Sequence, residues 1–300
     1  MRISCAAIAL ALVAATVPLC PAAGAGEPGR AEGTLTLDRA SVALTHVYAR
    51  EILEIPEMRY PDWPARTITV ILTDRPMPQN HRVSYTLAVE LSFAGQMRGL
   101  MLEIDPATRT VRSGRTLVPD AERPQFFTVI GDPPMVALEG FAEDGAAGIV
   151  TARAWTRQPM EVVSFDDQPG PKSFTFDVSF TARIMPAPKL LETLEGEAAK
   201  ASAPGQALKR FLEAVAAADP AAIRAAVISD HPALAMLDPG GLAQLKEMVL
   251  TGGASPDAAY GRLAKVYVYE NGATVLLKEA EGWSSYLVAR EDGTWKLGGP

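Results

Sequence analysis

Four aromatic side chains in the last third of the chain have the types and spacing that suit a binding pocket. Tyr267 and Tyr269 are two residues apart in an alternating stretch, so a strand there would place both on one face. Trp283 begins a neighbouring predicted strand, and Tyr286 lies within it. Each ring offers an apolar body and a polar tip, which suits the wall of a pocket for a small apolar ligand. We treat these four as the candidate ligand-binding residues; sheet packing or a dimer face is the more common reason for such a pattern.

The residues that usually carry catalysis or bind metals are scarce. The three histidines, His46, His81 and His231, lie too far apart for the short ligand spacing of a zinc site. No G-x-S-x-G nucleophile motif occurs, and Asp166-Asp167 lacks the spacing of an EF-hand loop. The sequence therefore predicts no metal, no cofactor and no identifiable catalytic residue. A hydrolase or isomerase with His46 or His81 as its base remains an alternative.

The first 25 residues have the features of an export signal. Arg2 precedes an uncharged apolar run over 3–19, and Ala23-Gly24-Ala25 has the A-x-A form of a signal-peptidase site. The run is near the lower length limit for a membrane span, and the helix-breaking Pro18 and Pro21 stand at its end. We expect cleavage near Ala25 and a periplasmic or secreted mature protein.

Both cysteines, Cys5 and Cys20, lie in this leader. The mature chain would then form no disulfide and contain no thiolate nucleophile or cysteine metal site. Lipid attachment through Cys20 is disfavoured, because Pro18 and Leu19 stand where small residues are expected.

Size and charge limit the remaining classes of protein. The leader carries one charge, Arg2, so its removal takes the net charge from −7 to −8. An acidic chain of this kind is a poor match for nucleic acid or an anionic membrane surface. The length that remains favours two domains, and no second apolar run is long enough to span a membrane.

Short alternating segments dominate the first of these domains, residues 26–185. The clearest is Phe174-Thr175-Phe176-Asp177-Val178-Ser179-Phe180, in which every second residue is apolar. About eight such strands predict an all-β antiparallel sandwich or barrel. Proline-flanked residues 186–203 are expected to form a linker with at most one short helix.

Residues 204–300 change to a helical pattern followed by strands. Leu208, Phe211, Leu212 and Val215 share one face of a predicted helix. Four strands follow, and the Asn271-Gly272 pair between two of them is a strong hairpin signal. The pattern predicts an α+β domain with helices on a curved four-stranded antiparallel sheet.

Two resemblances accompany these patterns. The opening PGQALKRFLEAVAAADPAAI and the hairpins VYVYENGATVLLK and SSYLVAREDGTWKLGG make the C-terminal third similar to small secreted bacterial members of the NTF2-like superfamily. That resemblance implies a cone that often holds an apolar pocket. Some members are enzymes with an Asp, His or Tyr inside the cone, a set that this sequence does not match. The FTFDVSFTARI strand resembles uncharacterised exported β-sandwich domains.

Three functions are consistent with these observations. The first is a non-enzymatic exported protein that binds a protein partner or a small apolar ligand, and it is the one that the missing catalytic motifs favour. The second is an envelope assembly or structural role as a homodimer, through the exposed face of the NTF2-like sheet. The third is the hydrolase or isomerase described above.

Overall fold

The computed structural model describes residues 29–38, 40–78, 88–89, 91–92, 94–119, 126–128, 135–161, 173–229, 231–250 and 253–298. The expected signal peptide with its two cysteines, His81 and the Asp166-Asp167 pair lie outside the described residues. No helix in the described ranges is long and apolar enough to cross a membrane.

The chain divides into two compact units. One unit consists of Met1–Ala49, Val70–Leu102 and Arg109–Ile184, and the other of Arg50–Thr69, Glu103–Thr108 and Met185–Pro300. Two short segments from the first half of the chain therefore belong to the second unit. The contiguous domains predicted from the sequence, 26–185 and 204–300, do not include this exchange.

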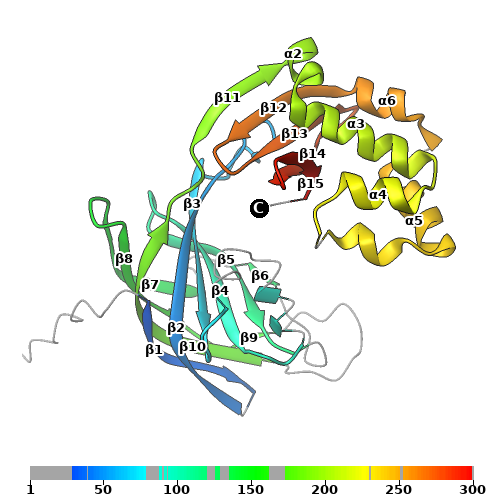
Figure 1. Ribbon diagram of the computed structural model, residues 1–300. Coiled ribbons are helices and arrows are strands. Elements are labelled where there is room, and N and C mark those ends of the chain that lie inside the picture. The colour runs from blue at the N-terminus through cyan, green and yellow to red at the C-terminus, as the bar shows by residue number, and fades with distance from the viewer. Residues whose placement is uncertain are drawn as a thin grey trace, which may run out of the picture. The chain divides into compact units, whose positions relative to one another are not determined.

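The first unit contains most of one mostly antiparallel sheet of ten strands; residues 50–53, 66–69, 103–105 and 185 of these strands are grouped with the second unit. The strands are β1 Arg30–Leu37, β2 Ala40–Leu53, β3 Arg66–Thr73, β4 Gly99–Asp105, β5 Thr110–Leu117, β6 Phe126–Thr128, β7 Val136–Asp144, β8 Ile149–Thr156, β9 Met160–Glu161 and β10 Ser173–Met185. Their order is β6-β5-β4-β3-β2-β1-β10-β8-β7, with β9 paired to β10, and the sheet curls into a half-barrel (Figure 1). The prediction of an antiparallel β domain is confirmed in its coarse form: the described strands form one curled half-barrel sheet, and residues 88–89 and 91–92 are helical.

Strand β10 shows why alternation predicted this part well. Phe174, Phe176, Val178 and Phe180 are all buried, while Asp177 between them is exposed. Period-two burial of this kind is what a strand with one covered face requires.

Gly33 in β1 is needed where β1 pairs with β10. A Cβ at this position would lie 2.2 Å from the Asp177 carbonyl oxygen and 2.5 Å from the Val178 Cα. We expect Gly33→Ala to lower the free energy of unfolding by about 2 kcal/mol, because the two backbones must separate. Urea denaturation followed by circular dichroism measures this. Gly145→Ala is the control, since a Cβ there meets nothing within 4 Å; equal stability losses in the two variants would contradict the prediction.

The second unit combines a five-stranded antiparallel sheet with a helical layer on one face (Figure 1). Its strands are β11 Leu190–Glu195, β12 Leu263–Tyr269, β13 Gly272–Glu279, β14 Gly282–Glu291 and β15 Thr294–Leu297, in sequence order across the sheet. Its helices are α2 Gly196–Ala201, α3 Ala203–Ala216, α4 Pro220–Ala226, the 3₁₀ helix η3 Pro232–Met236, α5 Pro239–Val249 and α6 Pro256–Gly261. The α+β class is confirmed. The sheet has five strands and not four, because β11 and α2 form within the expected linker 186–203.

Helix α3 supplies the centre of this unit's core. Leu208, Phe211, Leu212 and Val215 are all buried in one cluster with residues of β12 to β15, as the helical spacing predicts. Helix α5 behaves differently: Leu245 is buried, but Met248, which its spacing also places inward, is exposed. Helix α5 is therefore covered along a narrower stripe than α3, with Leu245 its one buried residue.

Candidate functional site

The register of the second sheet assigns its aromatic residues to two opposite faces. Val266, Val275 and Tyr286 form one row across β12, β13 and β14, and this row packs against the helices. Tyr267 pairs with Thr274 in the next row, on the face away from the helices. We call these the helix face and the outer face.

Tyr267 on the outer face is hydrogen-bonded to a residue that lies 210 positions earlier in the sequence. Its hydroxyl donates a hydrogen bond of 2.7 Å to Oε2 of Glu57, which belongs to the segment 50–69. Lys265, two residues earlier on the same face, lies with Nζ 2.6 Å from Oε1 of Glu57 and 2.8 Å from Oε1 of Glu195. Tyr267 is only 8% exposed. Glu57, Lys265, Glu195 and Tyr267 form what we call the ion-pair cluster. It attaches the segment 50–69 to the sheet.

Glu57 is the dominant partner of Lys265 in this cluster. Its side chain is 16% exposed against 66% for Glu195, and its oxygen lies closer to Nζ. Solvent screens an exposed carboxylate much more than a half-buried one. Glu57 therefore carries most of the stabilisation, and Glu195 adds a weaker contact at the rim.

The electrostatics of the cluster fix its protonation near neutral pH. Burial, followed by the hydrogen bond to Glu57, raises the pKa of Tyr267 to about 12. Hydrogen bonds to Glu195 and Glu57 raise the pKa of Lys265. Burial alone would raise the pKa of Glu57, but hydrogen bonds from Lys265 and Tyr267 together outweigh it and lower that pKa. A neutral tyrosine, a charged lysine and an ionised carboxylate that already bond one another make an anchor, and none is poised as a general base.

The four aromatic residues singled out from the sequence do not share one surface. Tyr269 lies on the outer face with Tyr267 and is half-buried, and burial followed by the charge of Glu57 raises its pKa. Trp283 is also on the outer face, with Lys278 Nζ 5.9 Å from its ring centroid. Tyr286 points to the helix face and packs on the core. The structure thus brings Tyr267 and Tyr269 together and separates Tyr286 from them.

A second feature, which the sequence reasoning missed, lies in the segment that Glu57 anchors. Leu53, Met58, Tyr60 and Trp63 are all exposed, Tyr60 by 66% and Trp63 by 43%. The Tyr60 and Trp63 ring centroids are 5.4 Å apart with the planes tilted by 50°. We call residues 53–65 the aromatic loop. Its sequence signal is a pair of aromatic residues within a proline-rich turn, LEIPEMRYPDWPA, between two strands.

Backbone hydrogen bonds give the aromatic loop a defined shape. The Glu54 N–H donates to the Ala65 carbonyl at 3.0 Å and closes its base. The Met58 N–H donates to the Ile55 carbonyl at 3.0 Å, and the Trp63 N–H donates to the Tyr60 carbonyl at 2.9 Å. Together with the Glu57 anchor, these turns present the aromatic side chains on an ordered backbone.

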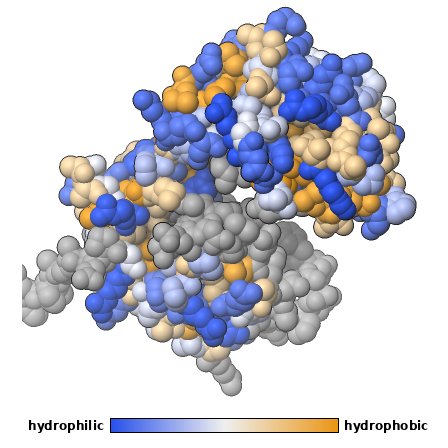
Figure 2. Space-filling model, viewed as in Figure 1, coloured by the Kyte–Doolittle hydropathy of each residue, from blue (hydrophilic) through white to orange (hydrophobic). Residues whose placement is uncertain are grey.

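Strand β11 is the other exposed apolar region that stands out. Figure 2 shows apolar side chains of the second unit over β11 and over part of the helical layer, and Leu190 and Leu191 of β11 are exposed. This edge strand also carries the exposed Glu192 and a register shift between Leu190 and Glu192. Charges and bulges are the devices that protect sheet edges from pairing, so β11 is the weaker candidate surface.

The two described histidines have local structural roles. His231 caps η3, its Nδ1 accepting a hydrogen bond of 3.1 Å from the Ala233 N–H, and its ring lies 6.1 Å from that of Phe211. His46 Nδ1 lies 2.9 Å from Thr45 Oγ1. Among the residues that the structure describes, no group of three or more His, Cys, Asp or Glu side chains could hold a metal ion.

The aromatic loop and its ion-pair anchor are therefore the best candidate site in the second unit, and their geometry suits binding more than catalysis. Comparison of the chain with protein-family models, with curated proteins and with solved structures gave no significant match.

Proposed function

We propose that this protein is an exported, non-enzymatic binding protein that recognises a protein partner through the aromatic loop. The observation that carries this proposal is the clustering of exposed apolar side chains. Nine large hydrophobic residues in the described part of the chain are exposed, and four of them, Leu53, Met58, Tyr60 and Trp63, lie within eleven consecutive positions. Exposed apolar residues scattered singly need no explanation, whereas a local concentration marks an interaction surface.

The composition of the loop favours a protein partner. Tyrosine, tryptophan, methionine and arginine are enriched at protein interfaces, and the first two dominate binding hot spots. Tyr60 and Trp63 provide the aromatic rings, and Met58 and the exposed Arg59 stand beside them in sequence. A central aromatic pair flanked by a polar, charged rim is the usual anatomy of such a surface.

Preorganisation supports the same proposal. Ordering a flexible loop on binding costs free energy for each side chain and backbone unit that is immobilised. Here the turns of the aromatic loop and the contact of Glu57 with Lys265 and Tyr267 already order the loop when the protein folds. The loop can then bind with little rearrangement.

The homodimer alternative, in which a second copy pairs with the sheet of the second unit, has little support at the centre of the outer face. Leu276 at the centre of that face is fully buried, and Thr274 is 6% exposed. A second copy could therefore not pair through this part of the outer face without first uncovering it. Dimerisation through the aromatic loop remains an outcome of the test below. The export signal, periplasmic location and NTF2-like ancestry belong to this proposal as supporting inferences from the sequence.

Site-specific photo-crosslinking tests the proposal. A benzophenone amino acid is placed at Trp63 in one variant and at Met248 in the control, because Met248 is exposed to a similar degree on α5. After incubation with envelope extract of the native organism, we expect an ultraviolet-dependent adduct of one defined mass at position 63 and none at 248. An adduct of twice the chain mass would replace the partner with a second copy. Adducts of equal yield at both positions, or none at either, contradict the proposal.

The identified partner then allows a quantitative prediction. Trp63→Ser is expected to weaken binding by about 30-fold, which corresponds to the loss of roughly 2 kcal/mol from one aromatic hot spot. Met248→Ser is expected to leave the dissociation constant unchanged. Titration calorimetry of the purified pair measures both. An unchanged affinity for Trp63→Ser with intact folding by circular dichroism would place the contact elsewhere.

A further inference from the structure

The exposed apolar side chains of the second unit concentrate in two segments of the chain. Four of them lie in the aromatic loop, and three more, Met185, Leu190 and Leu191, lie within seven consecutive positions that end in the first residues of β11. Together they are seven of the nine large hydrophobic residues that are exposed in the described part of the chain. If the two segments are neighbours in space, these side chains form one interaction surface.

A carboxylate at the base of the aromatic loop connects the loop to the start of β11. Glu51 Oε1 lies 2.5 Å from Nε of Arg66, so the residues on either side of the loop are paired. Glu51 Oε2 accepts a hydrogen bond of 3.0 Å from the Ala187 N–H. Ala187 precedes the first residue of β11 by three positions. The base of the loop is therefore fixed next to the chain that enters β11.

The ion-pair cluster connects the same loop to the end of β11. Lys265 Nζ lies within 2.8 Å of two carboxylate oxygens, one from Glu57 of the loop and one from Glu195, the last residue of β11. A single ammonium group thus joins the loop and the strand. Because the loop is bonded near both ends of β11, it lies beside this strand along the outer face of the sheet.

Strand β11 is the open edge of the second sheet. Among the described strands it pairs with β12 alone, and Figure 1 shows it at the border of the sheet. At the opposite edge, the Ile228 N–H donates a hydrogen bond of 2.9 Å to the Leu297 carbonyl of β15. An edge strand presents backbone N–H and C=O groups that an extended segment of another protein can pair with.

The charge of β11 limits which segment can pair with it. Three of the eight residues 190–197 are glutamates and none is basic. Glu192 is exposed and makes no ion pair among the described residues. Opposite charges on adjacent strands attract and like charges repel. A second copy of β11 is therefore a poor partner for this edge, whereas a basic segment is a good one.

We propose that the partner of the aromatic loop adds an extended segment of basic and apolar residues to the open edge of β11. The backbone of the segment pairs with β11, and its basic side chains lie near Glu192. Its apolar side chains contact Leu190, Leu191 and the rings of the loop. This inference rests on the proposed function, because it names the kind of protein segment that the loop surface recognises. The charge that protects β11 from other strands then selects this one.

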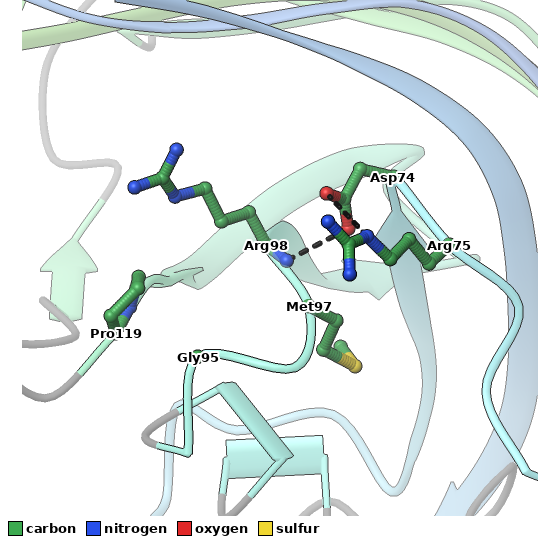
Figure 3. A pocket seen from close by; sticks show the side chains of 6 residues that line it. All are labelled: Asp74, Arg75, Gly95, Met97, Arg98 and Pro119. Atoms are coloured by element: carbon green, nitrogen blue, oxygen red, sulfur yellow. Dashed lines mark hydrogen bonds and ion pairs between the residues drawn. The ribbon is translucent and has the colours of Figure 1, made fainter.

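A small pocket in the first unit has a different character (Figure 3). It is lined by Asp74, Arg75, Gly95, Met97, Arg98 and Pro119. Asp74 Oδ1 accepts a hydrogen bond of 2.8 Å from the Arg98 backbone N–H, and Asp74 Oδ2 lies 3.8 Å from Arg75 Nε. This carboxylate therefore holds the walls of the pocket together, and the pocket takes no part in the surface formed by the loop and β11.

Hydrogen–deuterium exchange of the whole protein tests the edge without the partner. The probe is a peptide of three Lys-Val repeats with blocked ends, and the comparison peptide has three Glu-Val repeats. We expect the Lys-Val peptide to slow exchange of the amides in 190–195 by about threefold, because pairing protects them, and the Glu-Val peptide to have no effect. Equal protection by both peptides would overturn the role of charge. No protection by either would overturn the docking edge.

A charge reversal on β11 locates the binding of this peptide. Glu192→Lys is expected to weaken binding of the labelled Lys-Val peptide by about fivefold in fluorescence anisotropy, since a favourable cross-strand pair becomes a repulsive one. Glu247→Lys is the matched control, because Glu247 is an exposed glutamate on α5 and the change in net charge is the same. It is expected to bind as the parent protein does. Equal losses in the two variants would mean that net charge alone attracts the peptide, and would contradict the site.

Photo-crosslinking separates failure of this inference from failure of the proposed function. A benzophenone amino acid at Leu191 is compared with the one at Trp63 in the same envelope extract. We expect adducts of the same mass at both positions. An adduct at 63 without one at 191 would overturn docking at the edge and keep the aromatic loop as the partner surface. Absence of an adduct at 63 would contradict the proposed function itself, and this inference with it.

Discussion

Phe211→Ala is expected to lower the free energy of unfolding of the second unit by about 4 kcal/mol. Phe211 is 2% exposed on α3, in a cluster that includes Leu208, Val266 and Val275. Removing its ring leaves a cavity between the helix and the sheet, and a rigid sheet on one side limits how far the walls can collapse.

Guanidinium denaturation followed by tryptophan fluorescence measures this loss, because Trp283 and Trp295 report on the second unit. Phe211→Leu is the control and is expected to cost about 1 kcal/mol, since it keeps most of the buried volume. A loss below about 1 kcal/mol for Phe211→Ala would mean that the helix–sheet interface does not limit the stability of this unit.

Lys265→Met is expected to have the second-largest effect, a loss of about 3 kcal/mol near neutral pH. The substitution leaves Glu57, 16% exposed, with a carboxylate that has lost its cation. Removing one partner of a partly buried pair is costly because the other charge stays desolvated. Glu57→Gln combined with Lys265→Met is expected to recover part of the loss, since the uncompensated carboxylate that remains, that of Glu195, is exposed to solvent.

The pH dependence of this loss identifies its origin. The pKa of Glu57 is lowered in the folded protein, so its contribution is present above the unfolded value of about 4.3 and is lost as pH falls through the folded pKa. The pKa of Lys265 is raised, so its contribution is present below about 10.4 and is lost as pH rises through the folded pKa. The stability difference between parent and variant should therefore be largest between about pH 5 and 10 and shrink on both sides.

The control for Lys265→Met is Lys278→Met. Lys278 lies on the outer face of the same sheet but is exposed, and it contacts the Trp283 ring at 5.9 Å. Its removal is expected to change stability by less than about 1 kcal/mol at any pH. If both variants lost the same free energy with the same pH profile, the ion-pair cluster would not be the anchor of the aromatic loop.

Features that depend on residues close together in sequence could be predicted for this protein. The buried stripe of α3, from Leu208 to Val215, follows from the helical period. The alternation of β10 and the Asn271-Gly272 hairpin follow from strand period and turn chemistry. The same strand period predicts that Tyr267 and Tyr269 share one face of β12, as they do.

Features that depend on partners distant in the sequence could not be predicted. Residues 190–195 have no strong strand pattern of their own, and they become β11 because β12, about 70 positions later, offers an edge to pair with. Tyr286 has the same residue type as Tyr267, but the register between β13 and β14 turns it to the helix face. A one-residue difference in register decides that outcome.

The amino-acid sequence by itself therefore determined the class of each unit, its strongest helix and hairpins, and the scarcity of catalytic motifs, because these depend on local period and composition. Only the tertiary structure decided the sites. Glu57 meets Lys265 and Tyr267 across more than 200 positions, and Glu51 accepts a hydrogen bond from the Ala187 N–H across 136 positions. Contacts of this kind arise when the chain closes long loops to bury its apolar surface, and no local pattern records which distant residues then become neighbours.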